Sequence, residues 1–296
     1  MSEEELIIAV YCLVDEKLKS IIGELKLRSR GPKPSLTDAE VITLLIVGEY
    51  IGLGNDKKIW GYFKRLWKSW FPGLGCRTSF TRQSANLWNV QSKIQEKISQ
   101  EICQDKDLFL FDGFPIPICN IKRYKKSNLF RGEGGIGYCA AKDIKYFGFK
   151  GHLLITQEGV TRFISIAAAN IDERDVLPEV CLNLQGDTIA DKGLIRPELT
   201  QSLGNQGMTL HTPLRKNMND SRPIGFVHQI MNIRRKVETV IGQLVDRFKI
   251  QEIRAQDFWH LLSKIGRKVL AHTVCFLLNK KLHPETPLKL ELLLTF

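Results

Sequence analysis

The chain has 296 residues, with 43 Lys and Arg against 32 Asp and Glu, a net charge of +11 and a pI near 9.3. Hydrophobic residues make up 43% and charged residues 25%, which excludes a chain that is disordered throughout. Apolar runs such as residues 42–47 fall far short of the roughly 20 residues that a membrane helix needs. The start MSEEEL is acidic where a secretory signal is basic, so we expect a cytoplasmic protein without a membrane partner.

The positive charge is concentrated in two stretches. Residues 121–150 contain 8 basic and 2 acidic side chains, and residues 206–250 contain 8 basic and 3 acidic ones. Clustered positive charge favours a polyanionic partner, most simply nucleic acid, over a basic protein with scattered lysines. The 7 cysteines include no CxxC pair, which argues against a zinc ribbon.

The first 105 residues are predicted to be helical. Apolar residues recur at helical spacing from Glu4 to Leu25, and residues 28–34, with two prolines and a glycine, are expected to form a linker. Thr37 precedes Glu40 and a long apolar run, which is the pattern of a capping box. Further helices are expected over residues 59–71, whose aromatic side chains should pack in the core, and over residues 78–102.

The pattern changes near Asp107. We expect a strand ending at Asp112, then a basic, glycine-rich loop through residue 137, then two strands joined by a turn at Glu158-Gly159. A helix from Asp172, a strand ending at Asp191, another strand and two long helices complete the predicted order. The elements expected after residue 137 cover residues 146–157, 160–170, 172–184, 186–190, 208–216, 226–249 and 258–278. This order predicts an α/β domain over residues 106–280, followed by a tail over residues 281–296.

Three acidic residues are candidates for chemistry: Asp112, Asp191 and Glu238. Ligands bind at strand ends in α/β sheets, where the two aspartates are expected to lie. Carboxylates also suit Mg²⁺, and a two-metal site can clamp the attacking and leaving oxygens of a phosphodiester. Taken singly, each residue also fits a structural role, as a turn or cap aspartate or as an exposed ion pair between Arg234 and Glu238.

Six motifs in order carry a resemblance to a known family. They are FLFDGFPIPICNIKR, GYCAAKDIKYFGFKGHLLIT, AANIDERDVLPEV, IADKGLI, TPLRKNM and RRKVETVIGQL. Over about residues 36–280 the chain resembles the DDE transposases of the IS982 insertion-sequence family. The resemblance implies a ribonuclease-H-like catalytic domain, a mixed sheet with flanking helices, in which Asp112, Asp191 and Glu238 hold two Mg²⁺ ions, with Mn²⁺ as a substitute.

The resemblance also implies an activity and partners. The enzyme would cleave and join DNA strands at the terminal inverted repeats of its own insertion sequence. Its partners would be double-stranded DNA, as element ends and target, and further copies of itself in a synaptic complex. The N-terminal region would recognise the element ends. Two alternatives remain open: an inactive DNA-binding derivative of a transposase, and a ribonuclease-H-like nuclease without strand transfer.

The transposase signature around the third acid is only partly present. Many relatives of this broad class carry an Arg four residues before the catalytic Glu, and Arg234 fits that position. The Tyr and Lys associated with that Arg are replaced by Met231 and Val245. His152 is expected to be a satisfied core histidine. The residues expected to contact DNA are Lys122, Arg123, Tyr124, Lys125, Lys126, Lys142, Lys145, Lys150, Arg215, Lys216, Arg234 and Arg235.

Overall fold

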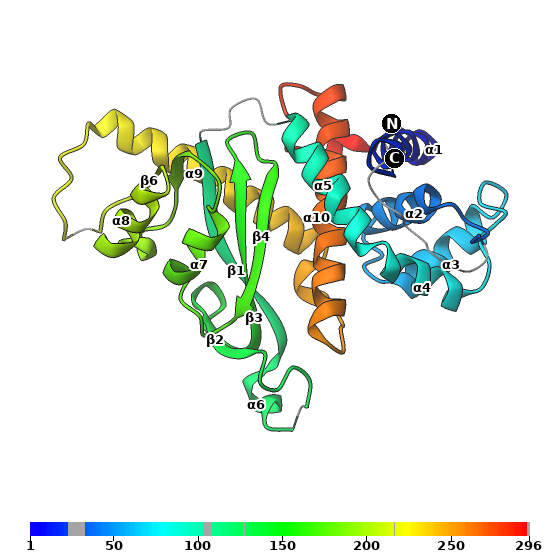
Figure 1. The fold of residues 1–296 in the computed structure, drawn as a ribbon, viewed down its shortest axis with the longest axis horizontal. Helices are drawn as coiled ribbons and strands as arrows, with labels where there is room; N and C mark the ends of the chain where they lie inside the picture. Colours follow the sequence, from blue (N-terminus) through cyan, green and yellow to red (C-terminus); the bar gives the residue numbers. More distant parts are fainter. Residues whose placement is uncertain (23–32, 103–107, 127, 216, 295–296) are drawn as a thin grey trace. The chain divides into compact units, whose positions relative to one another are not determined.

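The computed structural model describes residues 1–22, 33–102, 108–126, 128–215 and 217–294. The chain forms two compact units (Figure 1). The first unit consists of Met1–Ile102, Gln243–Ala255 and Trp259–Phe296, and the second consists of Cys103–Gly242 and Gln256–Phe258. None of the described helices is long and apolar enough to cross a membrane.

The first unit is helical, as predicted, and is built around a buried helix. Its helices are α1 (Glu3–Ile22), α2 (Asp38–Tyr50), α3 (Asp56–Leu66), α4 (Arg77–Asn86), α5 (Trp88–Ile102), the end of α9 (Ile224–Asp246) and most of α10 (Phe258–Leu282). Every residue of α2 except Glu40 is buried. The predicted capping box starts this helix, because the Thr37 hydroxyl accepts from the Glu40 N–H while the Glu40 carboxylate accepts from the Thr37 N–H.

The aromatic stretch packs largely as predicted but is helical over only part of its length. The buried rings of Phe63 and Phe71 meet edge to face, with centroids 5.7 Å apart. Helix α3 ends at Leu66, five residues before the predicted end. Pro72 disfavours helical backbone at Phe71, and the turn brings the Phe71 ring back onto the core. Trp70 stays 42% exposed.

A buried network of charges joins α2, α3 and α10 inside the first unit. Glu49 is fully buried and accepts from the Lys268 ammonium at 2.5 Å. The Arg267 guanidinium lies 2.7 Å from the other Glu49 oxygen and also donates to Asp56. Lys268 in addition donates to the Phe248 carbonyl at 2.6 Å. Two cations therefore face two carboxylates, and the network is neutral as a whole.

The C-terminal residues pack on their own unit. Leu290 and Leu293 are buried, the Tyr50 hydroxyl donates to the Leu290 carbonyl at 2.7 Å, and the Met1 ammonium donates to the Leu293 carbonyl at 3.1 Å. The compact units therefore differ from the predicted division after Gly242, since most of α10 and the tail belong with the N-terminal helices. The predicted boundary near residue 105 and most of the predicted linker at 28–34 lie outside the described residues.

The second unit contains a six-stranded mixed sheet, in the order β2-β3-β1-β5-β6, with β4 also paired to β3. Strands β3 and β4 are antiparallel to their neighbours, whereas β1, β5 and β6 run parallel. This confirms the predicted fold class. The strands are β1 (Leu108–Asn120), β2 (Gly135–Cys139), β3 (Ile144–Thr156), β4 (Thr161–Ala168), β5 (Gly186–Ile189) and β6 (Met208–His211), and the short helices are α6 (Ile121–Tyr124), α7 (Glu173–Val180) and α8 (Pro197–Asn205).

Two local predictions in this unit are wrong, and one helix was missed. Strand β1 does not end at Asp112 but continues to Asn120. Its two prolines are tolerated because pairing with β5 stops at Leu110, which leaves an open edge where no N–H is needed. Residues 135–137 of the predicted glycine-rich loop form β2, where a Cβ on Gly135 would lie 1.7 Å from the Asn170 side-chain oxygen. Helix α8 was not predicted.

The packing of α7 on the sheet fixes the surroundings of β1. Val176, Leu177 and Val180 of α7 pack against Phe109 and Phe111 of β1 in one buried cluster. The cluster also contains Leu154, Cys181, Ala190, Leu194, Leu199, Leu203 and Met208. The first turn of α7 consequently lies over the middle of β1, beside Asp112.

His152 is a core residue, but it is not satisfied as predicted. Its ring lies parallel to that of Phe111, with centroids 6.1 Å apart, and neither ring nitrogen has a hydrogen-bond partner within the described part of the chain. Burial and, to a smaller extent, the charge of Lys150 together lower the pKa of His152 to about 4. The neutral imidazole is thus favoured in the folded state.

We expect the free energy of unfolding to fall as the pH drops from 6.5 towards 4. In this pH range His152 is protonated in the unfolded chain, where its pKa is 6.5, but stays neutral in the folded protein, where its pKa is about 4. Between pH 7 and pH 5 this difference amounts to about 2 kcal/mol. Over the same pH change, the free energy of unfolding of His152→Leu should fall by about 2 kcal/mol less than that of the wild type. Urea unfolding followed by circular dichroism measures both. An equal loss in both proteins would contradict the assignment.

Candidate active site

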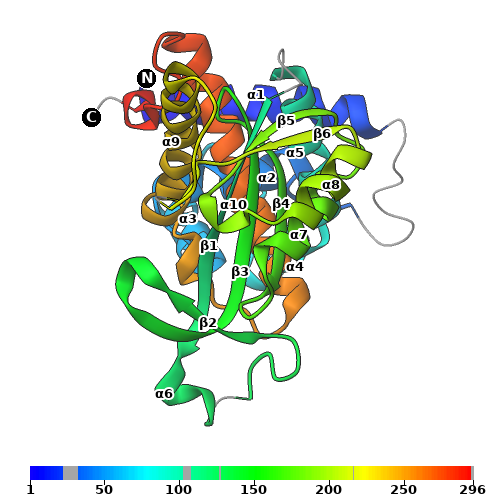
Figure 2. The ribbon, with the colours of Figure 1, turned by 90° about the vertical axis from the view of Figure 1, so that its left-hand side faces the viewer.

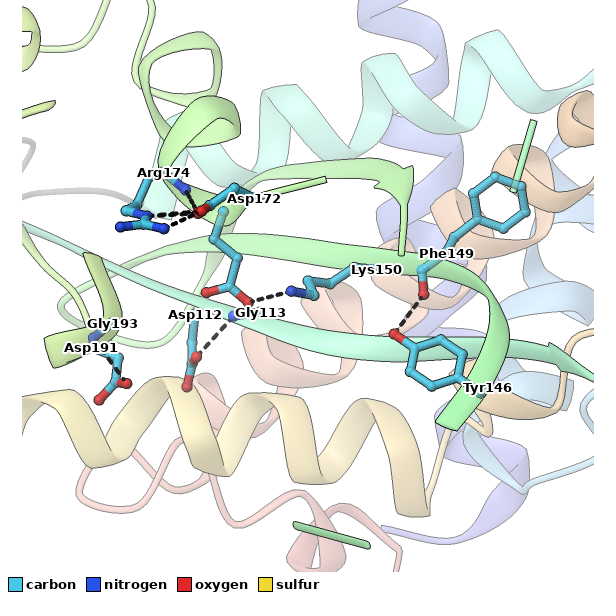
Figure 3. Close-up of polar contacts among 10 residues, drawn as sticks. Asp112, Gly113, Tyr146, Phe149, Lys150, Asp172, Arg174, Asp191 and Gly193 are labelled. Atoms are coloured by element: carbon cyan, nitrogen blue, oxygen red, sulfur yellow. Dashed lines mark hydrogen bonds and ion pairs between the residues drawn. The ribbon is translucent and has the colours of Figure 1, made fainter. Parts of the chain in front are cut away.

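The parallel register of β1 and β5 brings Asp112 and Asp191 together. The last paired residues of the two strands are Leu110 and Ile189, and each aspartate lies two positions further on. Side chains alternate along a strand, so both aspartates continue the face of that last pair. Beyond this point β5 has ended, and the carboxylates lie where the two strands separate. Figure 3 shows both side chains pointing toward α9.

Helix α9 supplies Glu238 and Arg234, which lie one turn apart. The Arg234 guanidinium lies 3.1 Å from Glu238, 3.5 Å from Asp191 and 3.7 Å from Asp112. The helix is held in place by the buried Val237 and by Lys236, which donates to the Gln157 carbonyl at 2.9 Å. One guanidinium therefore gathers all three predicted acids.

The three side chains differ in their access to solvent. Asp112 is 20% exposed, Asp191 38% and Glu238 50%. Burial, helped by the charges of Glu173 and Asp191, raises the pKa of Asp112 to about 6, against the opposing effects of the Gly113 N–H and of Arg234. A nearby cation stabilises the ionised form of such a buried carboxylate.

Asp191 has a structural role as well as a place in the site. One of its oxygens accepts from the Gly193 N–H at 3.4 Å, which caps the short 3₁₀ turn Lys192–Leu194 (Figure 3). The other oxygen is the one that faces Arg234. One oxygen of Asp191 thus caps a turn, while the other faces Arg234.

The donor chemistry suits a hard divalent cation, since three carboxylates converge on one positive group. Within the described residues, no three His, Cys, Asp or Glu side chains are already arranged to hold a metal ion. The Arg234 guanidinium instead serves as the cation that the acids share. Metal binding at these acids would therefore require Arg234 to move aside.

Glu173 is a neighbour of the site that was not predicted. It is the first residue of α7, and its carboxylate lies against the backbone of β1, 2.5 Å from where a Cβ on Gly113 would stand. Lys150 of β3, which was expected to contact DNA, is paired with Glu173 at 3.2 Å. The glycine that follows Asp112 and the acidic start of α7 were signals that could have pointed to this contact.

Most of the other predicted DNA contacts lie far from the acids along β1. Helix α6 begins where β1 ends, at the opposite end of that strand from β5 and β6 (Figure 2). Eight residues of strand from Asp112 to Asn120 correspond to roughly 26 Å. The Tyr124 ring packs on Phe147, with centroids 4.5 Å apart. The exposed cations at this end are Lys122, Arg123, Lys125, Lys126, Lys142 and Lys145.

Two further predicted cations are exposed in the structure. Arg235 is the neighbour of Arg234 on α9, and Arg215 follows β6. Lys216 lies outside the described residues. The structure therefore groups Arg234 with the acids, pairs Lys150 beside them, and spreads the remaining positive charges over other parts of the second unit.

The mixed sheet and its flanking helices have a ribonuclease-H-like fold. A cryo-electron microscopy structure of piggyBac transposase, in a synaptic complex with hairpin DNA, has the same fold, with a TM-score of 0.50 and 10% sequence identity. The similarity covers 99% of this chain and 79% of that chain.

The profile of the transposase DDE domain matches residues 102–258, just over half of the sequence. The chain belongs to the transposase DDE-domain family. No curated protein matches it.

Proposed function

We propose that this protein is a transposase of the IS982 type that cuts and joins DNA at the terminal inverted repeats of its own insertion sequence. The observation that carries the proposal is the convergence of Asp112, Asp191 and Glu238 on one guanidinium. Three carboxylates, one on β1, one just after β5 and one on α9, form an oxygen-rich site at the open edge of β1. Membership of the transposase DDE-domain family supports phosphodiester cleavage and transesterification as the proposed chemistry of this site.

The acids would hold two Mg²⁺ ions, or Mn²⁺ as a substitute. When bound, the metals supply activation of the attacking oxygen and stabilisation of the leaving oxygen. The protein's own contribution is positioning. Strands β1 and β5 fix two of the carboxylates, and α9 brings the third. Arg234, released from the acids, is in reach of a phosphate near them and can bind its oxygens in bidentate fashion.

Double-stranded DNA is the proposed partner, as element ends and as target. The exposed cations around α6, together with Arg215 and Arg235, provide phosphate contacts that position a duplex without reading its sequence. The related piggyBac structure contains a synaptic complex with DNA. We accordingly propose that this chain also works as a homo-oligomer that holds two ends together.

A strand-joining assay tests the proposal against both alternatives. A duplex that carries a processed element end would be incubated with plasmid DNA, Mg²⁺ and the protein, and the products sequenced across the junctions. A transposase yields the end joined to new DNA. A nuclease without strand transfer yields only cut DNA, and an inactive derivative binds the end without cutting or joining it.

Arg234→Gln is expected to make thermal stability depend more strongly on metal. Without the guanidinium the three carboxylates repel one another, and an added cation no longer has to displace Arg234. Mn²⁺ should therefore raise the melting temperature of this variant by more than that of the wild type, as measured by differential scanning fluorimetry. The matched control is Arg235→Gln, which alters the exposed neighbour on the same helix. If Mn²⁺ shifts all three proteins equally, Arg234 does not occupy the place of the metal.

A further inference from the structure

The first unit contains a basic cavity of about 760 Å³, built from segments far apart in sequence. Its walls are the connection between α2 and α3, the segment that follows α9, and the first turns of α10. The charged residues that line it are Lys57, Lys58, Lys249, Arg254, Lys264 and a single acid, Glu252. The five cations outnumber the one carboxylate and repel one another, so binding of an anion would be favourable.

The buried charge network lies directly beneath this cavity and does not neutralise it. Asp56 and Phe248, which bond to Arg267 and Lys268, are the immediate neighbours of Lys57 and Lys249. That network balances two cations with two carboxylates of its own. It therefore fixes the backbone on both sides of the cavity and contributes no net charge to the lining.

Four of the five lining cations are available to a ligand. Lys264 donates to the Arg254 carbonyl at 2.7 Å, which holds one wall. The side chains of Lys57, Lys58, Lys249 and Arg254 have no hydrogen-bond or ion-pair partner among the described residues. The first turn of α3 is already capped by the Asn55 side chain, which accepts from the Lys58 N–H. The positive side chains, rather than the helix terminus, are thus the feature that a ligand would meet.

The lining also indicates which part of a nucleic acid would enter. Among the residues that the structure describes, no Phe, Tyr or Trp side chain lines the cavity, and its apolar side chains are those of Leu53 and Ile253. Bases are usually held by aromatic stacking, whereas phosphates are held by Lys and Arg. The composition therefore suits a run of phosphates and offers no surface on which a base would stack.

We propose that this cavity binds the sugar-phosphate backbone of duplex DNA, independently of the bases and at a place distinct from the three acids. The inference rests on the proposed function, which supplies DNA as the partner. It adds a second anchoring site, in which residues that follow α9 act together with the loop between α2 and α3. A duplex held here is bound equally tightly whatever its sequence.

The test compares two variants that each lose three positive charges. The first is Lys57→Gln, Lys58→Gln and Arg254→Gln; all three residues are exposed, so the fold should be retained. The control is Lys93→Gln, Lys97→Gln and Lys281→Gln in the same unit. Lys281 lies 17 positions after Lys264 on α10, about 25 Å along the helix. Circular dichroism melting of both variants verifies folding.

Fluorescence anisotropy with two 30-base-pair duplexes, one an element end and one of unrelated sequence, would give Kd at several salt concentrations. The cavity variant should bind both duplexes at least tenfold more weakly at low salt. Its slope of log Kd against log salt should shrink by about 1 for each cation that contacts a phosphate. The control should change the slope by less than 1.

Each other result overturns the inference in a recognisable way. If the wild type binds and joins DNA while the two variants have the same slopes, the cavity is not a DNA site and the proposed function still stands. If the cavity variant loses affinity for the element end alone, the cavity reads bases rather than phosphates. If the wild type shows no salt-dependent binding to either duplex, both the cavity site and the proposed function are wrong.

Discussion

Asp112→Asn is expected to abolish DNA cleavage and joining while DNA binding persists. Asparagine keeps the shape of the side chain but removes the charge that a metal needs, and one neutral amide cannot replace an anionic oxygen at a divalent ion. Metal stabilisation of the transition state is worth several kcal/mol, so the rate should fall roughly a thousandfold or more. Asp191→Asn and Glu238→Gln should behave alike, because all three carboxylates face the same guanidinium.

Single-turnover joining of a processed element end, with anisotropy to measure DNA binding, makes this comparison. Asp187→Asn is the matched control, since Asp187 lies on β5, four residues before Asp191, but pairs with His211 at 2.6 Å instead of with Arg234. We expect this control to join DNA at a rate close to that of the wild type. Near-normal joining by any variant of the three acids would remove that residue from the site.

Glu49→Gln is expected to destabilise the first unit by about 3–5 kcal/mol. The substitution leaves Lys268 and Arg267 buried with Asp56 as the one carboxylate of the network. Removing one partner of a buried ion pair is strongly destabilising, because the remaining charge stays buried without its counter-charge. Burial already lowers the pKa of Lys268 against the attraction of Glu49. Without that carboxylate, the ammonium has little to hold its proton in the folded state.

Chemical unfolding followed by helical circular dichroism measures this effect. The control is Asp15→Asn, which removes the partner of Lys19 in a pair on the surface of α1, where Lys19 is 74% exposed. Exposed pairs contribute at most about 1 kcal/mol, so the control should unfold almost like the wild type. A Glu49→Gln variant as stable as the Asp15→Asn control would show that the buried network adds nothing to stability.

Local patterns predicted much of the fold because their causes are local. The Thr37 and Glu40 side chains need only each other and one turn of backbone to form the capping box. The turn at Gly159 needs only a residue that accepts a positive φ, here 102°. Helices with clear apolar periodicity were found for the same reason.

Features that depend on distant partners were not predictable in this way. Strand β1 continues past Asp112 because β5 stops pairing at Leu110, and nothing within residues 107–119 reports the length of β5. The Gly135 region looks like a loop in sequence, yet the close approach of Asn170 requires a glycine within a strand. In the first unit, the ion pair between Asp56 and Arg267 joins residues 211 positions apart.

In the candidate site, too, some features were predicted from the sequence and others depend on the tertiary fold. The residue types and order of Asp112, Asp191 and Glu238 were predicted through the family resemblance, and the structure brings them together. The central position of Arg234 and the contact of Glu173 with Gly113 arise only once α9 and α7 have packed on opposite faces of the sheet. A sequence shows that a charged residue is present, but its partner is set by the tertiary fold.

The most direct test of the central claim uses the DNA that flanks the gene, several hundred bases on each side. This DNA would be incubated with the protein and Mg²⁺ or Mn²⁺, beside Asp191→Asn, and every nick mapped to the base. We predict discrete, metal-dependent nicks at matching inverted repeats with the wild type and none with the variant. Wild-type protein that has assembled on this DNA yet leaves it uncut, or nicks that persist in Asp191→Asn, would contradict a catalytic site built from these acids.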